Sequence, residues 1–223
     1  MKKKIVFLIV IIFACLFLYV IHNKLNSSDI EVKKNVEEIQ EEIIDILNEE
    51  DDIVAKINNM NITKKDVAWT KFFGDEMNNK DAILKTIEKH VLYEEAKKQN
   101  IIVSERSRKE QTDLIDAFRE KEYTEEFLNK INMTKEEYVL NLEKQINIIT
   151  IVSEFKHNIY NDIVNNQLNC ENEKVKKLVK EYPIKKEQFD NDEIEYDDLV
   201  NFRDSIITEY INYIISTYEI IYK

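Results

Sequence analysis

The most informative pattern of apolar and polar positions opens with the run Ile53–Ile57, whose alternation is typical of a half-buried strand. Asn58 and Asn59 follow, and asparagine tolerates the left-handed backbone conformation that a tight turn needs. Thr63 then offers a hydroxyl that can cap a helix ending at Gly74, the only glycine of the chain. The pattern predicts a strand, a turn and a short helix in succession.

A second helix is predicted over residues 81–99, where apolar positions recur at helical spacing. Its apolar face carries Ile83, Leu84, Ile87, Val91, Leu92 and Ala96. Asn100 is placed to take the left-handed conformation after this helix, and Ser104 is placed to cap the next one. That next helix is charged and runs to Tyr123, with a thin apolar stripe formed by Leu114, Ile115 and Phe118.

The longest predicted helix covers residues 134–166 and follows a short helix, 125–130, that Thr124 can cap. Thr134 and Glu137 have the spacing of a capping box, and Met133 can pack on Tyr138 as a hydrophobic staple. No glycine or proline interrupts the segment, so a rod of roughly 48 Å is expected. Its apolar face carries Tyr138, Leu142, Gln145, Ile149, Val152, Phe155, Ile159 and Ile163.

The last part of the chain predicts two further helices. The first contains Val175 and Val179 and is expected to stop at Pro183. The second covers residues 197–222 and is apolar over a wide arc, so we expect it to pack on the long helix and on the helix at 81–99. The strand at 53–57 still needs a partner, for which Ile101–Val103 and Glu219–Tyr222 are the alternatives. The predicted fold is mainly α with a minor short β element.

An apolar run over residues 5–21 follows three lysines and reaches the lower limit for crossing a bilayer. The lysines favour a cytoplasmic N-terminus, which places the residues after His22 on the extracytoplasmic side of the cell membrane. The run is longer than the apolar region of a cleaved signal peptide and lacks an Ala-x-Ala site, so we expect residues 1–22 to form a signal anchor. Cleavage, or lipidation at Cys15, is the alternative.

Residues 23–52 are predicted to form a juxtamembrane linker and an amphipathic helix. Near-heptad spacing relates Val32, Val36, Ile39, Ile43 and Ile46. A dimerising coiled coil and a helix packed on its own domain are the two interpretations. Three heptads are short for a coiled coil, which favours the second, so a homodimer is not predicted.

Composition restricts the classes of function. The formal net charge is −12, and no basic face exists beyond the first four residues, which argues against nucleic-acid binding. Cys15 and Cys170 lie in an apolar and a polar stretch, so no disulfide framework is expected. The single glycine and single proline favour long helices with few tight turns.

Three motifs resemble the N-terminal chaperone domain of the SurA/PrsA-type extracytoplasmic foldases. They are the strand-to-helix segment 54–66, the segment 87–104 with Glu95-Ala96-Lys97-Lys98 and Ile101-Ile102-Val103-Ser104, and the start of the long helix at Met133–Gln145. Asn59 and Asn100 stand where that family usually has glycine. The resemblance implies a chaperone domain over residues 53–223. It also implies a missing parvulin isomerase domain, because the residues after Cys170 are too few and contain no glycine or histidine.

The expected function is that of a membrane-tethered holdase that binds unfolded or extended polypeptide without cofactor or catalysis. An adaptor for one folded envelope partner and a degraded isomerase are the alternatives. Aromatic side chains could line a client-binding groove between the first and third helices: Trp69, Phe72, Phe73, Tyr93, Phe118, Phe127 and Tyr138. Ordinary core packing is the other interpretation of each of these aromatic residues. An open edge of the strand at 53–57 would offer a second binding site, where an extended peptide could add as a strand.

Candidate chemistry is sparse. His22, His90 and His157 are far apart and lack partners at metal-ligand spacing, so no metal site is expected. A nucleophilic pair of Cys170 and His157 would have no orienting third group. The acidic run 190–198 lacks the glycine and the alternating ligands of an EF-hand loop and is expected to be a solvated loop.

Overall fold

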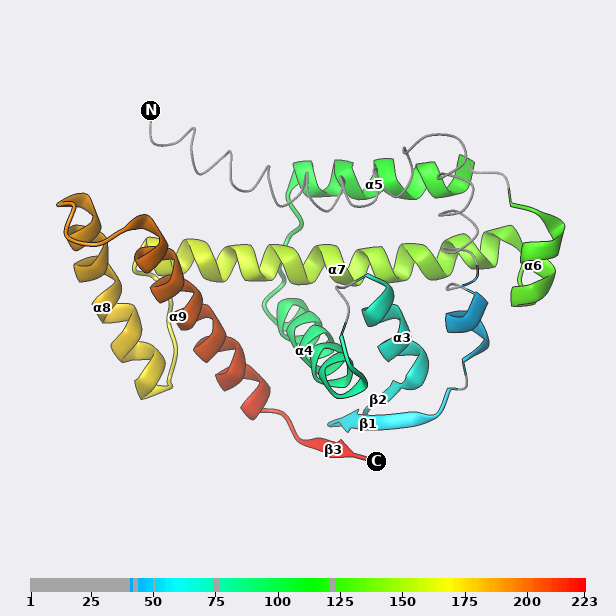
Figure 1. Ribbon diagram of the computed structural model, residues 1–223, viewed down its shortest axis with the longest axis horizontal. Helices are drawn as coiled ribbons and strands as arrows, with labels where there is room; N and C mark the ends of the chain where they lie inside the picture. The colour runs from blue at the N-terminus through cyan, green and yellow to red at the C-terminus, as the bar shows by residue number, and fades with distance from the viewer. Residues whose placement is uncertain (1–40, 42–43, 50, 74–76, 121–122) are drawn as a thin grey trace.

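The computed structural model describes residues 41, 44–49, 51–73, 77–120 and 123–223, the side chains at 117 and 118 excepted. The described part is mainly helical with a small three-stranded sheet, as the sequence predicted (Figure 1). Its elements in chain order are β1 (Ile53–Ile57), β2 (Met60–Thr63), α3 (Lys64–Phe72), α4 (Asn79–Lys98), α5 (Glu105–Glu120), α6 (Glu125–Ile131), α7 (Lys135–Val164), α8 (Glu173–Asp190), α9 (Tyr196–Ser216) and β3 (Ile220–Tyr222).

The long helix α7 organises the molecule. Its 30 residues span about 45 Å, close to the predicted rod. Figure 1 shows α5 along one side of α7, and α3, α4 and the sheet on the other side. α8 and α9 pack at one end of α7, and α6 lies at the other end. Because neighbours lie on several sides, α7 buries more positions than one stripe, including Val139, Ile146 and Ile148, whereas the predicted Ile149 is only partly buried.

Threonine or serine begins α3, α5, α6 and α7, as predicted. Thr63 forms a capping box with Asp66, and Thr134 forms one with Glu137. The Thr124 hydroxyl accepts from the Phe127 N–H at 3.2 Å, and the Ser104 hydroxyl accepts from the Ser107 N–H at 3.2 Å. These bonds satisfy donors that each helix leaves free in its first turn, which fixes where the helix begins.

Asparagine takes the turn conformations that glycine usually supplies. The described residues with positive φ are Asn58, Asn100, Asn132, Asn166 and Asp192, with φ between 50° and 59°. The last four follow the ends of α4, α6, α7 and α8, where a left-handed residue closes the helix. In the hairpin the positive φ falls on Asn58, so the expectation for Asn59 was wrong. Gly74 lies outside the described residues.

The sheet has the order β2-β1-β3, with both neighbours antiparallel to β1. Ile57 faces Ile220 and Ala55 faces Tyr222 across the β1–β3 pair. The segment after α9 is therefore the second partner of β1, and the alternative at Ile101–Val103 was wrong. The helix predicted over residues 197–222 was therefore too long. The observed helix α9 ends at Ser216, because the residues after it form backbone hydrogen bonds with β1.

Pro183 does not stop a helix, contrary to the prediction. α8 runs from Glu173 to Asp190 with Pro183 in its interior. A proline there removes one backbone hydrogen bond at a cost of about 3 kcal/mol. The ring is exposed, whereas Val175, Val179 and Tyr182 before it and Phe189 after it pack into the core. Packing on both sides of the proline thus holds the two halves in one helix.

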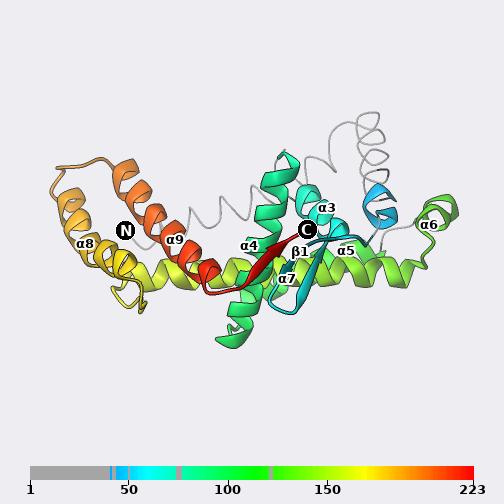
Figure 2. The same cartoon turned by 90° about the horizontal axis from the view of Figure 1, so that it is seen from below.

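The main core lies where α4, α7, α8, α9 and the sheet meet, and Figure 2 shows α9 leading into β3 beside β1. α9 packs on α4 and α7, which confirms its predicted docking. On α4 the buried face includes Ala82 and Thr86, while Leu84 is 44% exposed, so its assignment to the apolar face was wrong.

The carboxylate of Glu154 on α7 holds the beginning of α5, whose described side chains include none that is fully buried. It accepts hydrogen bonds from the Ser104 hydroxyl at 2.6 Å, from the Ser104 N–H at 3.3 Å and from the Ser107 hydroxyl. The described part of α5 runs to Glu120, and Tyr123, to which the helix was expected to run, is not helical. Within the described residues, no helix has the length and apolar character to cross a bilayer. The proposed anchor at 5–21 lies outside them.

Candidate functional site

Five of the seven predicted groove residues come together at one end of α7. α3 supplies Trp69 and Phe72, and Phe73 follows as its C-cap residue; α6 supplies Phe127, and α7 supplies Tyr138. The Trp69 ring centroid lies 5.8 Å from that of Phe73 and 5.7 Å from that of Phe72. The Phe127 and Tyr138 centroids are 5.3 Å apart. Tyr123 joins them, and these six side chains are called the aromatic cluster below.

Local sequence explains how the cluster forms. Trp69, Phe72 and Phe73 have the i, i+3, i+4 spacing that places side chains on one face of a helix. The left-handed residue Asn132 separates α6 from α7, so the two helices change direction there. Met133 packs against the same cluster as Tyr138, which fits the predicted staple.

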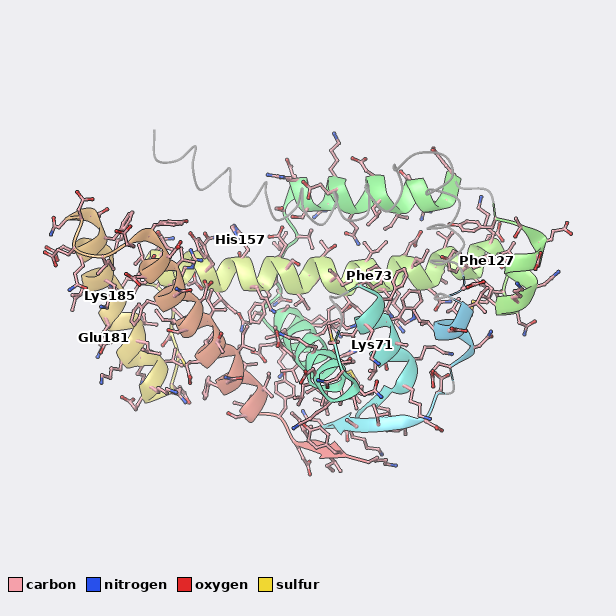
Figure 3. All side chains as sticks on the ribbon, in the orientation of Figure 1. Lys71, Phe73, Phe127, His157, Glu181 and Lys185 are labelled. Carbon is pink, nitrogen blue, oxygen red and sulfur yellow. The ribbon has the colours of Figure 1, made fainter. Side chains whose placement is uncertain are left out.

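Burial divides the cluster into an interior and a rim. Trp69 and Phe127 are each 3% exposed and Tyr138 is 2% exposed, so these three are core residues. Phe72, Phe73 and Tyr123 are only partly buried and form what we call the aromatic rim. Figure 3 shows Phe73 where the end of α3 meets α7, and Phe127 between α6 and α7. The accessible surface is therefore shallow and lies on a rigid base.

Tyr123 was not predicted as a member of this site. It stacks on Phe127 with ring centroids 5.8 Å apart and meets Tyr138 edge-on at 5.1 Å. A recognisable signal was present, because Tyr123 directly precedes the capping Thr124 and thus occupies the staple position of α6. The Lys135 ammonium lies 5.8 Å from the centre of the Tyr123 ring. Burial raises the pKa of Tyr123 to about 12, so its hydroxyl stays protonated.

A segment before the sheet covers part of the cluster. Ile46 and Leu47 are 5% and 6% exposed and pack into the cluster interior. The Asn48 amide donates a hydrogen bond to the Lys130 carbonyl at 3.3 Å. At Ile46 and Leu47 the helix predicted within residues 23–52 packs on its own domain, which agrees with the second interpretation. Val32, Val36, Ile39 and Ile43 lie outside the described residues.

Of the two remaining predicted residues, Tyr93 is not part of this cluster. Tyr93 packs against the main core, with the Lys97 ammonium 5.2 Å from its ring centre. The side chain of Phe118 lies outside the described part of the structure. Among the described side chains, Tyr93 is therefore the predicted groove residue that lies elsewhere.

Two titratable groups of α4, Lys89 and His90, interact with the Asp66 carboxylate of α3. His90 Nε2 lies 3.9 Å from an Asp66 carboxylate oxygen. Burial, together with the charge of Lys89, lowers the pKa of His90 to about 4 against the opposing effect of Asp66. Burial also lowers the pKa of Lys89 to about 8. His90 is thus neutral at physiological pH, and its environment disfavours the protonated form.

The residues considered for chemistry do not approach one another in a catalytic arrangement. His157 stacks on Tyr160 with ring centroids 6.2 Å apart, and Cys170 accepts a hydrogen bond from the Asn172 N–H at 3.3 Å. Burial raises the pKa of the Cys170 thiol, which reduces its thiolate fraction. No group of three or more histidine, cysteine, aspartate or glutamate side chains within the described ranges is arranged to hold a metal ion.

One of the cavities among the described residues lies where the end of α4 meets α7 and α9. Its volume is about 210 Å³, and its walls include Ile101, Phe155 and Tyr210 beside the polar Asn158 and Asp162. Pockets for drug-sized ligands usually measure about 300–1,000 Å³, so this space suits a single side chain rather than a cofactor.

Comparisons with protein-family models, curated proteins and solved structures gave no significant match for this chain.

Proposed function

We propose that this chain is a membrane-anchored extracytoplasmic chaperone-like protein that holds non-native or extended segments of secreted proteins without prolyl isomerase activity. The observation that carries the proposal is the aromatic rim of Phe72, Phe73 and Tyr123 on its buried base. The resemblance of the strand, helix and long-helix motifs to the SurA/PrsA-type chaperone domain supports it. The lysines and the apolar run at 5–21 support the anchor and its orientation.

Partly exposed aromatic side chains suit a binder of many unrelated segments. A non-native chain exposes apolar side chains in no fixed pattern, so a shallow surface serves it better than a shaped pocket. The neighbouring Met133 adds an adaptable apolar contact. Each ring contact contributes about 0.5–1.5 kcal/mol, so three rim residues give weak, reversible binding.

The rim is also preorganised. Phe73 stacks on Trp69 with an angle of 20° between the ring planes and meets Phe72 at 83°. These contacts restrict the rings before a client arrives, which reduces the entropy lost on binding.

An aggregation assay with the full chain in lipid nanodiscs tests this function. The protein is expected to slow the aggregation of several unrelated denatured clients at near-stoichiometric amounts. No effect on any client would refute the proposal. If tight capture of one native envelope protein accompanies that result, the chain is an adaptor instead. Isomerisation of a prolyl peptide above the background rate would overturn the assignment as a non-enzyme.

A further inference from the structure

The strand β3 completes the sheet with very few side-chain contacts. Ile220 is partly buried, but Ile221 is 49% and Tyr222 58% exposed. Backbone hydrogen bonds flank the pair, from the Asn58 N–H to the Glu219 carbonyl at 2.8 Å and from the Lys223 N–H to the Val54 carbonyl at 3.0 Å. β3 is therefore attached to β1 mainly through its backbone, which any extended segment could replace.

The rest of the fold does not depend on β3. β1 is also paired with β2, and its core residues Ala55 and Ile57 are 0% and 2% exposed. Strands this short and exposed belong to the least stable part of a structure and open most readily. Release of β3 would leave the hairpin of β1 and β2 in place with one edge of β1 open.

Between α9 and β3, the side chain of Tyr218 attaches the chain to α4. The Tyr218 hydroxyl donates to a Glu95 carboxylate oxygen at 3.0 Å and accepts from the Lys98 ammonium at 2.6 Å. The same ammonium lies 4.4 Å from the centre of the Tyr218 ring. These contacts hold the chain to α4 just before β3, so the strand can leave β1 while α9 stays docked.

We infer that the edge of β1 facing β3 is a strand-addition site for extended polypeptide, and that β3 is its internal occupant. This inference deepens the proposed function and rests on it for the nature of the ligand. β3 itself defines the ligand chemistry, which is an extended segment antiparallel to β1. Its first residue, Ile220, is partly buried opposite the core residue Ile57, so a ligand needs an apolar residue there, whereas the exposed Tyr222 opposite Ala55 sets no such requirement.

Competition from β3 regulates this site. A tethered strand has an effective concentration on the order of millimolar, so a free peptide at micromolar concentration competes poorly while β3 is present. The apparent Kd for the peptide equals its intrinsic Kd divided by the fraction of molecules in which the edge of β1 is open. Removing β3 should therefore strengthen peptide binding by roughly tenfold or more.

A disulfide lock tests the inference in the full chain in nanodiscs. Lys56 and Ile221 are paired in the register and point away from the core, so the double variant Lys56→Cys/Ile221→Cys leaves the packing intact. Paired residues on antiparallel strands lie about 4.5–5.5 Å apart between Cα atoms, within the range of a disulfide. The probe is a fluorescent peptide of sequence Tyr-Glu-Ile-Ile-Tyr-Lys, followed by anisotropy. The matched peptide carries proline in place of its second isoleucine.

The reduced double variant is expected to bind the probe, whereas the oxidised variant, in which the disulfide holds β3 on β1, is expected not to bind it. A chain lacking residues 220–223 should bind the probe at least tenfold more tightly than the intact chain does. The proline peptide should bind neither the shortened nor the intact chain. Lys56→Cys alone, under the same oxidant, should behave as the unmodified protein. Equal binding of the probe by the locked and reduced forms would overturn the inference. It would also be overturned if the chain lacking residues 220–223 bound no peptide and had twice the monomer mass, because a second copy of the chain would then occupy the edge of β1.

The aggregation assay on the same samples separates this inference from the proposed function. If locked and reduced forms both protect clients but bind the probe equally, only the strand-addition site fails. If the probe distinguishes the two forms while neither protects any client, the proposed function fails and the peptide site stands.

Discussion

Replacing Phe73 by alanine removes one member of the aromatic rim and should both weaken client binding and lower the stability of the fold. Phe73 is partly buried and makes two ring contacts, at 5.8 Å with Trp69 and at 5.0 Å with Phe72. At about 0.5–1.5 kcal/mol each, the lost contacts should lower the free energy of unfolding by about 1–3 kcal/mol. The buried base of Trp69, Phe127 and Tyr138 stays in place.

The effect on binding follows from the same contact energy. One aromatic contact with a client contributes about 0.5–1.5 kcal/mol, so Phe73→Ala should raise the client Kd by about 2- to 12-fold. Anisotropy of a labelled, permanently unfolded client measures this change. Trp69 is the only tryptophan, so its emission reports whether the cluster is still folded.

Ile184→Ala is the matched control, because Ile184 is 58% exposed on α8, away from the aromatic cluster. It should change neither client affinity nor Trp69 emission. If Phe73→Ala lowers stability as expected but leaves the client Kd within twofold, the rim does not bind clients and the reasoning is refuted.

Three further changes test the structure itself. Between pH 6.5 and about 4, the unfolded chain binds a proton at His90 that the folded chain does not bind. The free energy of unfolding should therefore fall as the pH falls through this range. Urea titrations should show a flatter pH dependence for His90→Gln. Thr134→Ala should cost about 1 kcal/mol in thermal unfolding, whereas Thr134→Ser should cost little; equal losses would contradict the capping box. Asn100→Gly should be tolerated, but Asn100→Val should cost about 1–2 kcal/mol, since φ is 52°; equal stability of these two variants would refute the left-handed assignment.

Local signals in the sequence were sufficient for the elements around the site. β1 has the predicted bounds, and Thr63, Thr124 and Thr134 cap the helices that they were expected to cap. These features depend on residues three or four positions apart, which a single sequence displays directly. The spacing of Trp69, Phe72 and Phe73 belongs to the same kind of signal.

Features that depend on distant partners were predicted less well. The helix through Pro183 persists because the core holds Tyr182 and Phe189 on either side of it. The residues after Ser216 form a strand because β1 offers them an edge. The division of the aromatic cluster into interior and rim depends on Ile46, Leu47 and α7, which pack there from other parts of the chain. Periodicity shows that a side chain is apolar on one face, but not which element covers that face.

Photo-crosslinking tests the central claim most directly. A photoreactive phenylalanine analogue is placed at position 73 in one sample of the full chain in nanodiscs and at position 184 in another, and both are irradiated with an unfolded client. The account predicts that the client crosslinks at position 73 and not at position 184. Equal crosslinking at the two positions, or none at 73 while aggregation is still suppressed, would contradict it.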